Sequence, residues 1–126
     1  MPKKMANKYK SGMQGQQDAE AFLLARGYRI LERNYRVRDG EIDLIARHGS
    51  YIVFIEVKFR SGAGYGYPRE SVGAVKQRRI IKTAMHYIAV RGLDNQDFRF
   101  DVVEVLARDK QRVEINHIEN AFDTSF

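Results

Sequence analysis

The chain has 126 residues, no cysteine, and a formal net charge of +6 with an isoelectric point near 9.7. This length corresponds to one domain, and an apolar content of 44% is enough to build a core without cross-links. The lack of cysteine excludes disulfides, thiolate zinc sites and a cysteine nucleophile. No apolar run approaches the roughly 18 residues of a membrane span, and the lysine-rich start lacks the apolar segment of a secretion signal. We therefore expect a soluble cytoplasmic protein with no membrane partner.

The first part of the chain is expected to contain a disordered start and one amphipathic helix. Residues 1–10 are polar and basic, which is typical of a disordered N-terminus. A capping-box spacing that begins at Ser11, and apolar residues at helical intervals up to Gly27, predict a helix over residues 12–26.

Three strands are expected to follow this helix. Residues 28–37 carry a mixed strand pattern and lead into the turn Asp39-Gly40. Residues 41–46 and 51–59 are rich in β-branched and aromatic side chains, and the short connection between them predicts an antiparallel hairpin.

The second half of the chain predicts one more helix and two more strands. The remaining elements are a glycine-rich loop (residues 61–68), a helix (71–90), two strands (98–106 and 112–118) and a frayed tail (120–126). The resulting order is α-β-β-β-α-β with one further strand. We expect a single α/β domain over residues 11–119.

Basic residues are concentrated in two parts of the chain. Residues 1–38 hold nine Lys or Arg and three acids, whereas the rest of the chain holds thirteen of each. A basic stripe lies between Lys58 and Lys82, where seven basic residues accompany the single acid Glu70. Nucleic acid is the commonest partner of such a stripe. The alternative is a solvated cationic face that keeps the protein soluble.

Three charged residues, Asp43, Glu56 and Lys58, lie inside otherwise apolar strands. Because side chains alternate along a strand and the two strands form a hairpin, the three can converge at one end of the sheet. Two nearby carboxylates favour a divalent cation, and oxygen ligands select Mg²⁺ or Mn²⁺. A lysine beside that ion can orient or deprotonate a water, which is the chemistry of phosphodiester hydrolysis. The alternative is an ordinary cross-strand salt-bridge cluster on a solvent face.

Four segments around these residues carry a family resemblance: GEIDLIA at 40–46, FIEVKFR at 54–60, KQRRI at 76–80 and RFDVV at 99–103. Over about residues 15–106 the chain resembles the YraN-type family of small bacterial proteins. That family is similar to the archaeal Holliday-junction resolvases and belongs to the restriction-endonuclease-like, PD-(D/E)XK superfamily.

The resemblance implies a mixed central β-sheet flanked by helices, and Mg²⁺-dependent cleavage of DNA. Asp43, Glu56 and Lys58 match the D, E and K of the superfamily motif, and Ile42 stands where that motif has proline. The resemblance leaves open whether the substrate is a four-way junction, a flap, a single strand or RNA. Resolvase-like relatives act as dimers, so it also implies a homodimer.

The same resemblance implies supporting roles for Glu20 and Gln77. Glu20 matches the acid with which many resolvase-like proteins complete the metal site from their first helix, although a lone glutamate is also simply a good helix former. Gln77 falls on the apolar stripe at the start of the second predicted helix. In similar nucleases a polar residue there binds metal-bound water or a scissile phosphate, and a simple boundary residue is the alternative.

The basic stripe supplies the expected contacts to nucleic acid. Six of its residues are the candidates: Arg60, Arg69, Lys76, Arg78, Arg79 and Lys82. Such contacts position a duplex without reading its bases. Arg99 and Asp101, at alternate positions of one strand, predict a structural ion pair. The alternative to an enzyme is a non-catalytic nucleic-acid-binding or adaptor module on a nuclease fold.

Overall fold

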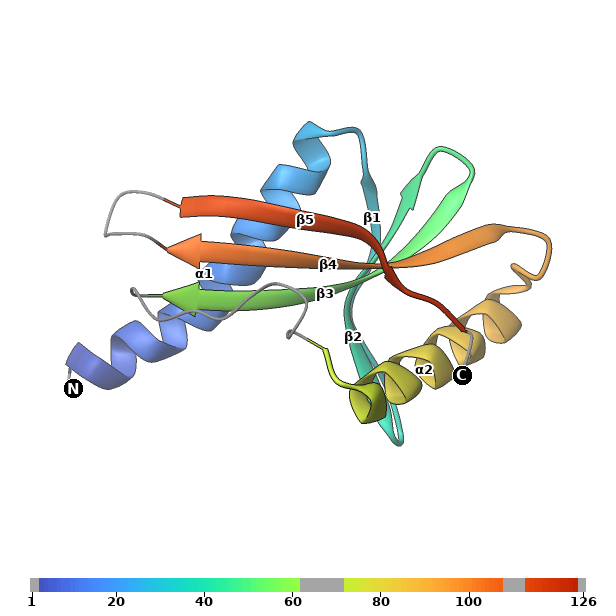
Figure 1. Cartoon of the computed structure of the whole chain (residues 1–126), viewed down its shortest axis with the longest axis horizontal. Coiled ribbons are helices and arrows are strands. Elements are labelled where there is room, and N and C mark those ends of the chain that lie inside the picture. The colour runs from blue at the N-terminus through green and yellow to red at the C-terminus, as the bar shows by residue number, and fades with distance from the viewer. Residues whose placement is uncertain (1–2, 62–71, 108–112, 125–126) are drawn as a thin grey trace.

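The computed structural model describes residues 3–61, 72–107 and 113–124. Seven elements follow one another in the order α-β-β-β-α-β-β (Figure 1). They are α1 (Lys3–Ala25), β1 (Arg29–Val37), β2 (Gly40–His48), β3 (Tyr51–Ser61), α2 (Ala74–Arg91), β4 (Asp97–Ala107) and β5 (Val113–Phe122). The α/β class and the order predicted from the sequence are therefore confirmed.

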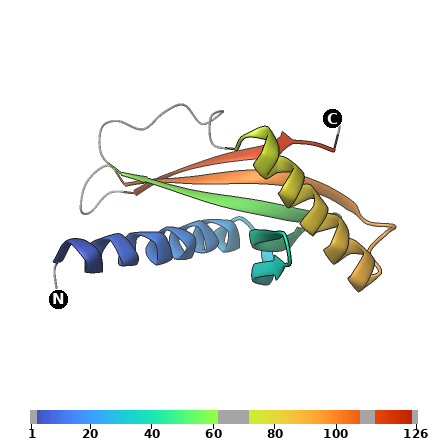
Figure 2. The same cartoon turned by 90° about the horizontal axis from the view of Figure 1, so that it is seen from below.

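The five strands form one mixed sheet in the order β1-β2-β3-β4-β5. Neighbouring strands are antiparallel except β3 and β4, which are parallel and joined by α2. Figure 2 shows the two helices at opposite ends of the sheet, with α1 running beneath β3. A mixed sheet flanked by helices is compatible with the restriction-endonuclease-like core that the resemblance implies.

Both faces of the central strand β3 are buried, which explains its nearly continuous apolar sequence. Val53 and Ile55 belong to a core cluster with Ala19 and Leu23 of α1. The alternate residues Ile52 and Phe54 belong to a second cluster, which lies against α2 and includes Ile80, Ala84 and Tyr87. The sheet therefore separates two apolar cores, one under each helix.

Helix α1 is longer than the sequence predicted. It begins at Lys3, whereas we expected a helix from residue 12; the expected disorder over residues 1–10 stays a prediction. This correction has a simple physical reason, since residues 3–11 contain neither glycine nor proline to interrupt helical geometry. At the other end Gly27, with φ +87°, ends the helix as expected.

Strand β5 is also longer than expected, because it reaches Phe122 and so enters the segment that we expected to fray. The ring of Phe122 stacks on that of Phe100 in β4, with ring centroids 5.0 Å apart. This aromatic contact holds the end of β5 on the sheet.

Helix α2 packs directly against the β1–β2 turn through Gly40. A Cβ atom on Gly40 would lie 2.2 Å from Thr83 Oγ1 and 3.1 Å from the Arg79 carbonyl oxygen, so glycine is required there for close approach. Figure 1 shows the turn reaching the helix. The buried face of α2 comprises Ile80, Thr83, Ala84, Tyr87 and Ile88.

We predict that Gly40→Ala lowers the free energy of unfolding by about 1–3 kcal/mol, the usual cost of overpacking. Urea denaturation measures this change directly. Gly73→Ala is the matched control, because a Cβ at Gly73 would meet nothing within 4 Å. Equal stability of Gly40→Ala and Gly73→Ala would contradict the close packing of the turn on α2.

Candidate functional site

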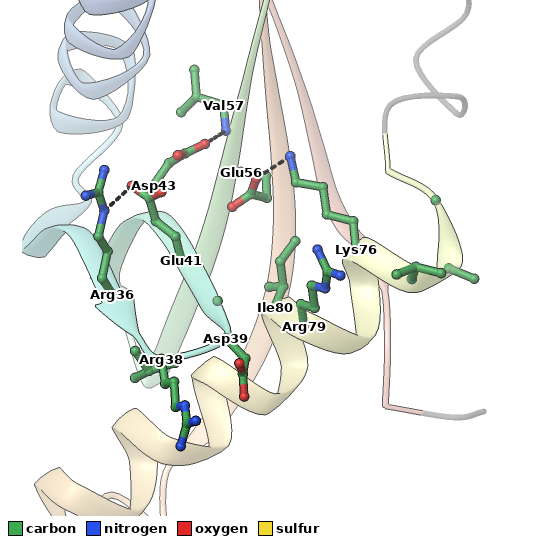
Figure 3. A pocket seen from close by; sticks show the side chains of 15 residues that line it. Arg36, Arg38, Asp39, Glu41, Asp43, Glu56, Val57, Lys76, Arg79 and Ile80 are labelled. Atoms are coloured by element: carbon green, nitrogen blue, oxygen red, sulfur yellow. Dashed lines mark hydrogen bonds and ion pairs between the residues drawn. The ribbon is translucent and has the colours of Figure 1, made fainter.

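A groove opens where β2 and β3 diverge. The two strands pair only from His48–Tyr51 to Leu44–Ile55, while β2 continues beside β1 as far as Gly40. The groove has a volume of about 900 Å³, with the β1–β2 turn as one wall and the start of α2 as the other (Figure 3). It is lined by Arg36, Val37, Arg38, Asp39, Gly40, Glu41, Asp43, Glu56, Val57, Gly73, Ala74, Val75, Lys76, Arg79 and Ile80.

Asp43 lies at the point of divergence. If the β2–β3 register continued by one residue, Asp43 would oppose Glu56. On its other side Asp43 falls opposite Asn34 of β1, whose φ of 52° marks a local irregularity. Instead of a ladder bond, the Val57 N–H donates to Asp43 Oδ2 at 2.8 Å. Burial raises the pKa of Asp43, and this bond and the nearby lysines oppose the shift.

Glu56 is buried, with only 4% of its surface exposed. Its Oε2 atom lies 3.2 Å from Nζ of Lys76, and its Oε1 atom has no hydrogen-bond partner among the described residues. Burial and the neighbouring charge of Asp43 raise the pKa of Glu56 to about 7, against the pull of Lys76. A buried carboxylate oxygen with no partner is energetically costly and is a candidate ligand atom.

Lys58 follows Glu56 by two residues and therefore lies on the same face of β3. Burial lowers the pKa of Lys58, and contact with Lys76 lowers it further, although both carboxylates act in the opposite direction. The neutral amine is thereby favoured more than in water. A neutral amine can accept a proton, which is the property that a general base requires.

The pKa of Glu56 gives a testable dependence of stability on pH. The folded protein holds the Glu56 proton up to pH about 7, whereas the unfolded chain releases it near 4.5, so stability falls as pH rises between these values. The fall amounts to about 3 kcal/mol. Glu56→Gln should therefore gain stability relative to wild type over this interval, as measured by urea unfolding at several pH values. A difference between the two proteins that is independent of pH would contradict the raised pKa.

The two carboxylates suit Mg²⁺, which keeps several waters in its shell, better than a metal ion that is held by protein ligands alone. Across residues 3–61, 72–107 and 113–124, no group of three or more His, Cys, Asp or Glu side chains is placed to hold a metal. Mg²⁺ commonly takes only one or two protein carboxylates and completes its shell with waters and substrate phosphates. Asp43 and the unpartnered Glu56 Oε1 suit this arrangement.

The structure does not bring Glu20 or Gln77 into this groove. Glu20 is paired with Arg33 of β1, whose Nε lies 3.0 Å from both carboxylate oxygens. Gln77 donates from Nε2 to the Val72 carbonyl at 2.9 Å and so closes the turn that leads into α2. Both side chains have structural partners, and their roles at a metal site stay predictions.

The basic residues of the stripe divide into three groups. Lys76 and Arg79 line the groove. Arg78 and Lys82 border an adjoining depression of about 580 Å³, which shares Arg79 with the groove. Arg60 instead pairs with the buried Glu104, at 3.5 Å from Nε to Oε2.

Arg69, the remaining residue of the predicted stripe, lies outside the described residues. Two arginines that were not predicted from the sequence complete this surface. Arg36 and Arg38 lie on the wall opposite α2 (Figure 3). The available signal was that both arginines adjoin the predicted Asp39-Gly40 turn.

A second charged cluster, on the α1 side of the sheet, is structural. Asp101 is fully buried and accepts bonds from Arg99 Nε at 3.1 Å and the Asn120 N–H at 3.0 Å, and it pairs with His117 Nε2 at 2.7 Å. Burial alone would raise the pKa of Asp101, but these bonds outweigh it and lower the pKa. The predicted Arg99–Asp101 ion pair is thus confirmed.

Comparison with known proteins identifies the family. Residues 15–105 match the profile of the Uncharacterised protein family UPF0102. The chain belongs to UPF0102. This is the YraN family, so the resemblance in the sequence is confirmed.

UPF0102 proteins of several bacteria match nearly the whole chain. The protein of Clostridioides difficile is 48% identical over 94% of this chain and 100% of its own length. That of Symbiobacterium thermophilum is 50% identical over 88% of this chain and 94% of its own. In the part of the present UPF0102 chain that the structure describes, no helix is long and apolar enough to cross a membrane.

Proposed function

We propose that this UPF0102 protein is a Mg²⁺-dependent DNA endonuclease. The observation that carries the proposal is the position of Asp43 and Glu56 in one groove, with one Glu56 oxygen that has no hydrogen-bond partner among the described residues. A carboxylate pair of this kind, beside a lysine whose pKa is lowered, supports phosphodiester hydrolysis. The family resemblance implies the reaction, cleavage of DNA, and the groove is where we propose that it takes place.

The chain's own residues divide the work of the reaction. Asp43 and Glu56 would hold the ion, which when bound would polarise the phosphate and lower the pKa of water. Lys58, as the neutral amine, orients the attacking water and takes its proton as the new P–O bond forms. The bond from phosphorus to the leaving sugar oxygen breaks in the same step, and solvent supplies the proton to that oxygen. The negative charge that develops on the phosphate is offset by Arg79 and Lys76 on the wall formed by α2.

Basic side chains on both walls of the groove support a polyanion as substrate. Arg36 at the end of β1 and Arg38 on the β1–β2 turn lie across the groove from Arg79 on α2 (Figure 3). The same wall also holds two acids, Asp39 and Glu41, and Glu41 pairs with Arg36 at 3.3 Å. Arg78 and Lys82 extend the basic surface into the adjoining depression. Contacts of this kind bind the phosphate backbone and make affinity fall steeply with salt. Branched DNA is the substrate that the resemblance to resolvases implies, and a bacterial enzyme of this kind would act in the cytoplasm.

The proposal predicts metal-dependent cleavage of labelled DNA. Duplex, single-stranded, flap and four-way-junction substrates are incubated with Mg²⁺, Mn²⁺ or EDTA. Asp43→Asn, Glu56→Gln and Lys58→Ala should each lower the cleavage rate by about 100-fold or more, because each removes a group required in the transition state. Asp97→Asn, which removes an exposed acid outside the groove, should cleave like wild type. Loss of cleavage in the three site variants excludes a contaminating nuclease.

The same experiment distinguishes the alternative, a non-catalytic nucleic-acid-binding or adaptor module. Salt-dependent DNA binding without cleavage, unchanged by the three substitutions, would contradict the enzyme and favour that module. The homodimer implied by the resemblance also stays a prediction, and light scattering with and without DNA tests it. A monomer under both conditions would contradict the dimer.

A further inference from the structure

Lys76 occupies an unexpected position. The sequence placed it among residues that contact DNA, yet its Nζ lies 3.2 Å from Glu56 Oε2, inside the groove (Figure 3). It is the third residue of α2, and its side chain is 48% exposed, whereas that of Glu56 is 5% exposed. The ion pair therefore joins a half-exposed side chain on the helix to a buried one on the sheet.

Two acids, Asp43 and Glu56, line the groove, and two lysines adjoin them: Lys58 on the same strand as Glu56, and Lys76 in contact with Glu56. A divalent cation that binds the carboxylates adds two positive charges within a few ångströms of the Lys76 ammonium. Repulsion at such distances is strong, and the free energy is lowered when one ammonium moves away.

Of the two lysines, Lys76 is the one that can leave. Lys58 projects from β3, the central strand of the sheet, where its backbone pairs with β4, and it is less exposed than Lys76. Lys76 stands in the first turn of a helix whose next turn brings Arg79 to the same groove. Its long, half-exposed side chain can turn toward solvent beside Arg79 without any movement of the backbone.

We propose that Lys76 is a resident counter-ion of Glu56, which a divalent cation must displace in order to bind. In the metal-free protein Lys76 holds the Glu56 carboxylate in place. On metal binding Lys76 moves to the wall of the groove and adds its charge to the surface proposed for DNA. This inference rests on the proposed function, because it requires that Asp43 and Glu56 hold the ion.

The competition predicts that removal of the Lys76 charge strengthens metal binding. Mg²⁺ is titrated calorimetrically into wild type, Lys76→Met and Lys76→Gln, in alkaline buffer above the Glu56 pKa of about 7. Both neutral variants should bind Mg²⁺ about tenfold more tightly than wild type, since the ion no longer competes with a like charge. Lys76→Arg retains the ion pair and should stay close to wild type.

Arg91→Met is the matched control. Arg91 lies at the opposite end of α2, is 50% exposed and pairs with Glu32 at the same distance of 3.2 Å. Loss of its charge tests whether any broken ion pair on this helix changes Mg²⁺ affinity. Circular dichroism confirms that each variant folds, and Glu56→Gln removes the proposed ligand.

The outcomes separate this inference from the proposed function. Tighter binding by both neutral variants, with wild-type affinity in Lys76→Arg and Arg91→Met, is the expected result. Wild-type binding that Glu56→Gln abolishes but neither neutral variant tightens would overturn the counter-ion role and leave the metal site intact. No Mg²⁺ binding by any of the proteins would overturn the counter-ion role together with the metal-dependent function.

Discussion

The bond from the Val57 N–H to Asp43 Oδ2 stands at the centre of this structure. The carboxylate takes the place of a ladder partner for the Val57 N–H, at the point where β2 leaves β3. Because the strands can separate there without an orphaned N–H at Val57, the β1–β2 turn is free to lie against α2. The groove and its two walls follow from that separation, and both Asp43 and Glu56 line the groove.

The charges around the groove then explain one another. Glu56 is buried, and one of its oxygens has no partner in the part of the chain that the structure describes, which is unfavourable for folding. Lys76 at the other oxygen offsets only part of that cost. A protein that keeps such a group sacrifices stability at that position, which is typical of sites that bind or react. The Arg99–Asp101–His117 cluster offers a contrast, because hydrogen bonds satisfy both Asp101 oxygens and lower its pKa.

The sequence predicted the elements well where local patterns determine them. The buried run of β3 and the hairpin with β2 followed from residue type, and the positions of Asp43 and Glu56 followed from register. The partners of long side chains did not follow, because they depend on how α2 docks on Gly40. The buried face of α2 includes Ile80 and Tyr87, and with this face against the sheet Lys76 lies beside Glu56. Neither this orientation of the helix nor the pairing of Glu20 with Arg33 can be recognised from the local sequence.

The most direct test of the account is a crystal structure of the wild-type protein with Mn²⁺, with anomalous diffraction used to locate the ion. We expect a peak within coordination distance of both Asp43 and Glu56, with Lys76 turned away from Glu56 toward Arg79. A structure at saturating Mn²⁺ in which the groove shows no peak and Lys76 still contacts Glu56 would contradict it.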